Sequence, residues 1–118
     1  MSSPSNQTAR VLGMFRTMNV IREFDEAAGR ASYAGEVRGS VHQYVGQEAI
    51  AVGVCANLRT TDFISSNHRG HGHSIAKGAD PAGMMKELFG KADGTCGGKG
   101  GSMHIADFSI GMLGANGV

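Results

Sequence analysis

Apolar side chains recur at helical spacing between residues 9 and 28, which predicts an amphipathic helix with one stripe that needs a packing partner. Arg16, Arg22, Asp25 and Glu26 fall outside this stripe, so we expect them on the other faces of the helix. Gly29 follows directly and predicts the end of the helix. The stripe consists of Val11, Phe15, Met18, Ile21 (or Val20), Phe24 and Ala28.

A second helix is predicted within residues 46–58, "GQEAIAVGVCANL", after a turn or loop in "RGSVHQY". Its residues are apolar or small on nearly every face, which is typical of a helix buried between layers or subunits. Cys55 lies in this helix, where a free cysteine most often serves as a small apolar core residue.

An extended segment and a third helix follow. "TTDFISS", residues 60–66, is a candidate for a short strand, and the histidine-rich stretch after it is predicted to be a loop broken by glycines. Asp80 is placed to cap a helix that has Pro81 at its first position. Gly90 stands just beyond the predicted end of this helix.

The last third of the chain is rich in glycine and has no periodicity in "KADGTCGGKGGSMH". For the tail, "IADFSIGMLGANGV", we expect a glycine-rich turn without a closing element. The fold class is therefore α/β, but only one or two strands are predicted, and a parallel sheet needs more strands with both faces covered. We expect this chain to be the opening portion of a larger protein.

Composition narrows the functional classes. The formal net charge of +1 provides no basic field that would hold nucleic acid or an acidic membrane surface. The start, "MSSPSNQTAR", lacks the apolar core of a signal peptide or membrane span, and we expect residues 1–9 to be flexible. Cys55 and Cys96 are isolated and form no CxxC motif. A soluble protein of the reducing cytoplasm is the expectation.

The stretch "SSNHRGHGHSIAKG", residues 65–78, carries the densest polar chemistry, and three interpretations compete for it. A zinc site is disfavoured, because His68, His71 and His73 lack the usual ligand spacing and Arg69 would place a fixed charge beside the metal. A merely solvated surface loop is the second interpretation. The third, an anion site, is favoured because an arginine fork suits phosphate oxygens and glycines let the backbone approach a ligand.

Four blocks of sequence resemble one enzyme family in the same order: "VHQYVGQEAIAVGV", "SSNHRGHGHSIAKGADPAGMMKELFGK", "GGKGGSMHIAD" and "LGANGV". The family is that of the alpha subunits of thiamine-diphosphate-dependent 2-oxo acid dehydrogenases, of the pyruvate dehydrogenase type, and the acetoin dehydrogenase alpha subunits are the more similar branch. The resemblance covers residues 10–118. It implies that these residues form the N-terminal portion of a thiamine-diphosphate-binding fold, a parallel sheet flanked by helices.

The resemblance also implies roles for particular residues. His68 and Arg69 match the pair that contacts the diphosphate of the cofactor. His42 matches the histidine near the substrate and the reactive thiazolium ring, and we expect it to be catalytic. His71 and His104 match recurrent positions near the active site, and we count His71 among the candidate catalytic residues.

The same resemblance places cofactor contacts at the backbone of Gly117 and Val118, and a Mg²⁺ motif, G-D-G followed by asparagine, downstream of them. Asp93-Gly94 with Asn116 imitates this motif, but it follows a helix and a glycine-rich loop instead of an apolar strand, so we assign no metal ligand. The Mg²⁺ ligands are expected beyond the C-terminus of this chain, and by itself the chain is expected to be inactive.

The implied activity is that of an oxidoreductase acting on acetoin or a 2-oxo acid, by decarboxylation or C–C cleavage, with acyl transfer to lipoamide. The implied partners are a beta subunit, in a heterotetramer of two alpha and two beta subunits, a lipoyl-bearing acyltransferase and a small-molecule substrate, with no nucleic acid or membrane. Two alternatives of other classes stay open: a non-catalytic interaction subunit, in which the apolar second helix is an interface, and a small zinc-binding module.

Overall fold

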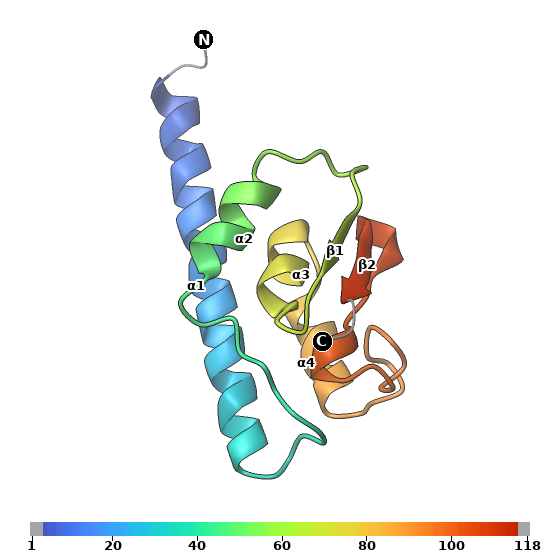
Figure 1. Ribbon diagram of the computed structural model, residues 1–118. Helices are drawn as coiled ribbons and strands as arrows, with labels where there is room; N and C mark the ends of the chain where they lie inside the picture. Colours follow the sequence, from blue (N-terminus) through green and yellow to red (C-terminus); the bar gives the residue numbers. More distant parts are fainter. Residues whose placement is uncertain (1–3, 116–118) are drawn as a thin grey trace.

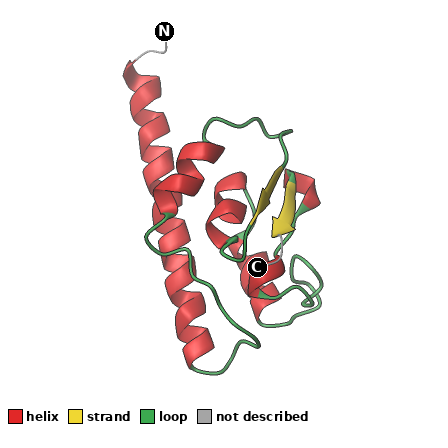
Figure 2. Ribbon diagram, in the orientation of Figure 1, coloured by secondary structure: helices red, strands yellow, loops and turns green. Residues whose placement is uncertain are grey.

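The computed structural model describes residues 4–115, which form a small α/β arrangement of helices beside a two-stranded parallel sheet (Figure 1). The long helix α1 contacts α2, α3 and α4, and the two strands lie on the side away from α1 (Figure 2). The elements in chain order are α1 (Pro4–Tyr33), α2 (Glu48–Cys55), β1 (Ile64–Ser66), α3 (His71–Lys77), α4 (Pro81–Leu88), the 3₁₀ turns η1 (Ser102–His104) and η2 (Phe108–Ile110), and β2 (Met112–Ala115).

Helix α1 confirms the predicted helix but extends it at both ends. The prediction that the helix ends at Gly29 is wrong, because this glycine lies inside the helix, where a Cβ would overlap the side-chain amide of Gln43. Its absent side chain serves close packing, and the alanines around it favour helix strongly enough to offset one glycine, which costs about 1 kcal/mol. The chain reverses instead at Gly35, whose φ is +75°.

Only the second half of the predicted stripe on α1 is covered. Ile21, Phe24 and Ala28 are buried in the core, whereas Phe15 is 61% exposed. Asp25 was expected on another face, yet it is fully buried, because residues 21, 25 and 28 share one side of a helix. Residues 4–9, part of the segment expected to be flexible, are helical, and their mobility stays a prediction.

Helix α2 buries one face and leaves the other open. Ala51 and Val52 belong to the core, while Ile50 and Val54 are 60% and 56% exposed, so the expected burial on nearly every side is not achieved within the described residues. Arg22 on α1 donates to the Glu48 carboxylate at 2.6 Å, which ties α2 to α1. This bond, offset in part by burial, lowers the pKa of Glu48 to about 2.

The strand predicted within residues 60–66 is confirmed for Ile64–Ser66, which form β1, but the loop predicted after it is wrong for residues 71–77, which form α3. Gly78 ends this helix in the left-handed conformation, with φ of +113°. Seven residues are too few to be helical by propensity alone, so α3 depends on its packing against α1 and α2. Because α3 contains one glycine and two histidines among its seven residues, its sequence shows no apolar helical pattern that would predict this packing.

Helix α4 confirms each local signal in its sequence. The Asp80 side chain accepts hydrogen bonds from the backbone N–H groups of Ala82 and Gly83, and Pro81 stands at the first helical position. Gly90 lies just beyond the end and has a φ of +66°. These signals act over three or four residues, which is why sequence alone predicts this helix well.

The tail was expected to lack a closing element, and here the prediction is wrong. Met112–Ala115 form β2, which pairs in parallel with β1. Gly111 permits this pairing, because a Cβ there would lie 2.5 Å from the carbonyl oxygen of Asp62. The α/β class is confirmed, and the larger thiamine-diphosphate-binding fold stays a prediction. No helix among residues 4–115 has both the length and the apolar character that a membrane crossing requires.

Candidate cofactor-binding site

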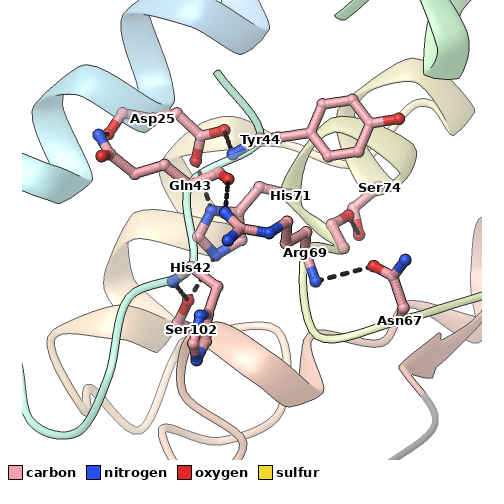
Figure 3. Close-up of polar contacts among 10 residues, drawn as sticks. Asp25, His42, Gln43, Tyr44, Asn67, Arg69, His71, Ser74 and Ser102 are labelled. Carbon is pink, nitrogen blue, oxygen red and sulfur yellow. Dashed lines mark hydrogen bonds and ion pairs between the residues drawn. The ribbon is translucent and has the colours of Figure 1, made fainter. Parts of the chain in front are cut away.

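The loop before α2, the segment after β1, α3 and η1 bring several of the predicted site residues together (Figure 3). His42, Arg69 and His71 lie in one cluster with Ser102, although 60 residues separate the two ends of this set in the sequence. The cluster contains two kinds of histidine, which differ in the partners of their ring nitrogens.

His42 and His68, the open pair, contact each other edge to face, with ring centroids 5.0 Å apart and an interplanar angle of 88°. Both residues are half-buried. Neither imidazole makes a hydrogen bond to another residue in the part of the chain that the structure describes. Their ring nitrogens are therefore available to a bound molecule, as donors or acceptors according to protonation.

Arg69 lies beside the open pair and is held at one corner of its guanidinium group. Its Nη1 donates to the carbonyl oxygen of Gln43 at 2.5 Å, and its backbone N–H donates to Asn67 at 2.9 Å. Within residues 4–115 no carboxylate forms an ion pair with this half-buried guanidinium. Arg69 thus combines a fixed position with unused donors, which is the chemistry of an anion site.

His71 and His73, the enclosed pair, are engaged at both nitrogens of each ring. His71 is fully buried, with Nδ1 2.5 Å from Oδ1 of Asp25 and Nε2 2.9 Å from Oγ of Ser102. His73 lies with Nε2 3.0 Å from the Tyr44 hydroxyl and Nδ1 2.5 Å from the hydroxyl of Ser66. Burial lowers the pKa of His73 and so favours its neutral form.

These bonds bear on two earlier expectations. In this arrangement His71 cannot meet a substrate directly, because it has no exposed surface and no free ring nitrogen. The glycines of residues 65–78 were expected to let the backbone approach a ligand, but at Gly72 a Cβ would overlap the Tyr44 ring, so this glycine serves packing within the protein. Among residues 4–115, no three His, Cys, Asp or Glu side chains are placed to share a metal ion.

Asp25 is a site residue that sequence reasoning missed. Both of its carboxylate oxygens are used inside the protein: Oδ1 on His71 and Oδ2 on the backbone N–H of Tyr44, at 2.6 Å. Its carbonyl oxygen also accepts from the side chain of Gln43 at 2.7 Å. The available signal was its spacing from Ile21, because a polar residue on the apolar face of a helix needs a buried partner.

Glu87 organises the glycine-rich loop that carries Ser102 to His71. The buried carboxylate of Glu87 accepts four backbone N–H bonds, from Cys96, Gly98, Gly100 and Gly101, at 2.7–3.2 Å. Burial alone would raise the pKa of Glu87, but these bonds outweigh it and the pKa is lowered. A run of closely spaced glycines soon after a helix with a glutamate in its last turn was the only sequence signal for this loop.

Of the three remaining predicted residues, one lies within the described residues 4–115. His104 lies on η1 and is exposed. Gly117 and Val118 lie outside the residues that the structure describes, so their expected backbone contacts stay predictions.

Comparisons with known proteins agree with the resemblance seen in the sequence. Residues 16–118 match the model of the family described as "Dehydrogenase E1 component". The alpha subunit of acetoin:2,6-dichlorophenolindophenol oxidoreductase from Bacillus subtilis is 57% identical over 109 residues, and its counterpart from Cupriavidus necator is 54% identical over 108. The alpha subunit of the pyruvate dehydrogenase E1 component from Zymomonas mobilis is 42% identical over 109 residues.

Each of these alignments covers 92% of this chain but only 31–33% of the relative. The chain therefore spans about a third of the length of these relatives.

Proposed function

Because the chain belongs to the dehydrogenase E1 component family, we propose that it forms part of the alpha subunit of a thiamine-diphosphate-dependent dehydrogenase. The substrate we propose is acetoin. Support for this choice comes from identity: the two relatives named for acetoin are 54–57% identical to the chain, against 42% for the pyruvate dehydrogenase subunit.

The observation that carries the proposal is the set of unused donors on Arg69 and the open pair. A diphosphate needs several fixed donors of positive or neutral character, and Arg69 has no carboxylate among residues 4–115 that would compete for its charge. We propose that Arg69 and His68 bind the diphosphate. The Gln43 carbonyl holds one corner of the guanidinium group, so little side-chain freedom is lost on binding.

His42 is proposed to hold or move a proton at the reacting end of the substrate. When bound, thiamine diphosphate supplies the carbon nucleophile and the electron sink for cleavage beside a carbonyl group. A proton must be delivered near the reacting oxygen. A half-buried imidazole whose ring nitrogens make no hydrogen bond among the described residues suits that task. The neighbouring ring of His68 limits the orientations that the His42 ring adopts.

Mg²⁺ is proposed to accompany the diphosphate and balance its charge. We assign no residue of this chain as its ligand. The proposed partners are a beta subunit, because the relatives are named as alpha subunits, and a lipoyl-bearing acyltransferase as acyl acceptor. A cytoplasmic location stays part of the proposal.

A chimeric subunit tests this function. The segment of the Bacillus subtilis alpha subunit that aligns with this chain, 109 residues long, would be replaced by the matching residues of this chain and produced with the beta subunit. We expect reduction of 2,6-dichlorophenolindophenol that depends on acetoin, thiamine diphosphate and Mg²⁺. The unmodified Bacillus subtilis subunit is the control. A chimera that assembles with the beta subunit but gives no turnover would favour a non-catalytic interaction subunit instead.

A further inference from the structure

Four groups form a continuous chain of hydrogen bonds from the core to the backbone of His42 (Figure 3). With a neutral His71 ring, Nδ1–H donates to the Asp25 carboxylate, and Nε2 then accepts from the hydroxyl of Ser102. The oxygen of Ser102 in turn accepts the backbone N–H of His42 at 3.4 Å. In each of these bonds the hydrogen is donated toward the Asp25 carboxylate at the buried end of the chain.

The same carboxylate also holds the segment after His42. Oδ2 of Asp25 accepts the backbone N–H of Tyr44, two residues further along the chain. The backbone of His42 is thus fixed on one side through His71 and Ser102 and on the other through Tyr44. Both supports end on one side chain, Asp25, which is fully buried.

We propose that Asp25 is a positioning residue for the reaction: it holds His42 in place through His71 and Ser102. This inference rests on the proposed function, in which His42 handles a proton. Asp25 does not touch the substrate, because it has no exposed surface. A buried carboxylate costs free energy that an apolar residue would not, and the bonds that compensate for it all lead toward the site.

Asparagine at position 25 separates this role from simple packing, because it has nearly the shape of aspartate. If its oxygen accepts from Tyr44, its NH₂ group faces Nδ1 of His71, which must then give up its proton. The proton moves to Nε2, and Nε2–H then points at the Ser102 hydroxyl, which can no longer donate to it. The bonds of His71 to residue 25 and to Ser102 reverse, while the backbone N–H of His42 still donates to the oxygen of Ser102, which then accepts two bonds.

The test uses the chimeric enzyme with Asp25→Asn, Ser102→Ala and the double variant. Asp93→Asn is the control, because Asp93 is an exposed carboxylate that forms its ion pair with Lys86. We expect each single variant to lower kcat for acetoin by roughly ten- to a hundredfold, since a small displacement of a catalytic group has effects of this size. The affinity for thiamine diphosphate should stay within about threefold, and the double variant should lose little more than the worse single variant.

The outcomes distinguish the proposals. If the unsubstituted chimera is active, three results would overturn the role of Asp25 and leave the proposed function standing. They are an unchanged kcat in the variants, an equal loss of kcat and cofactor affinity, and losses of kcat that multiply in the double variant. An unsubstituted chimera without turnover overturns the proposed function and the inference with it. If Asp25→Asn does not assemble, Ser102→Ala decides by the same criteria, because it removes only one hydroxyl.

Discussion

The open pair and the enclosed pair of histidines lie in one small region and have opposite surroundings. His42 and His68 are half-buried and make no hydrogen bond through their rings within residues 4–115. His71 and His73 use all of their ring nitrogens on protein groups. A histidine with every nitrogen engaged serves the structure, whereas one with free nitrogens can serve a ligand.

Helix geometry explains how neighbours in sequence come to differ so much. His71 and His73 are two positions apart on α3, which directs their side chains to nearly opposite sides of the helix. His71 therefore meets Asp25 on α1, while His73 meets Tyr44 and Ser66. His68 precedes the helix and turns toward His42.

The largest difference is expected when the same substitution is made in each pair. His71→Ala leaves the buried carboxylate of Asp25 without its partner and should lower the free energy of unfolding by on the order of 3–5 kcal/mol. His68→Ala removes no hydrogen bond among the described residues and should cost about 0.5 kcal/mol or less. Urea unfolding of the chimeric subunit measures both. Equal losses would show that the two pairs do not differ in structural role.

A smaller loss is expected from a methyl group placed between the enclosed histidines. In Gly72→Ala the new Cβ would overlap the Tyr44 ring, which should lower the free energy of unfolding by about 1–3 kcal/mol. Gly53→Ala is the matched control, because Gly53 is also helical and a Cβ added there would meet no atom within 4 Å. It should be neutral or stabilising by up to about 1 kcal/mol. Thermal unfolding compares them, and a neutral Gly72→Ala would contradict the tight packing of α3 on Tyr44.

The smallest effect concerns pH. Burial lowers the pKa of His73 below its ordinary 6.5, so the unfolded chain gains this proton first as the pH falls. The contribution to stability is complete above pH 6.5 and is lost as the pH falls through the lower folded-state pKa. As the pH falls below 6.5, the free energy of unfolding should therefore decline less steeply in His73→Gln than in the unsubstituted protein. If the free energy of unfolding had the same pH dependence in both proteins, burial would not lower the pKa of His73.

The parts of the fold that sequence predicted depend on short-range signals. Asp80, Pro81 and Gly90 specify α4 within a few residues, and β1 lies in a segment, residues 60–66, whose threonines, phenylalanine and isoleucine favour a strand. Helix α3 was missed because its stability comes from packing against helices distant in sequence. The strand β2 was missed for a similar reason, since its pairing partner lies about fifty residues earlier.

The candidate site shows the same division. The histidines and Arg69 were found because their residue types and the family motifs are visible in the sequence. Asp25, Ser102 and Glu87 were missed, because their importance lies in partners that only the fold brings near. The residues around Ser102 in the sequence do not predict its hydrogen bond to a histidine 31 positions earlier.

The proposed ligand role of the open pair and Arg69 is tested most directly by titrating thiamine diphosphate into the chimeric enzyme at fixed Mg²⁺. Arg69→Ala should weaken binding by roughly ten- to a hundredfold, the equivalent of about 1.5–3 kcal/mol for a charge-assisted contact. Arg59→Ala is the control, because that exposed arginine pairs with Asp62 and has no contact with the open pair. Equal cofactor affinity in the Arg69→Ala and Arg59→Ala proteins would contradict the assignment of the diphosphate to Arg69.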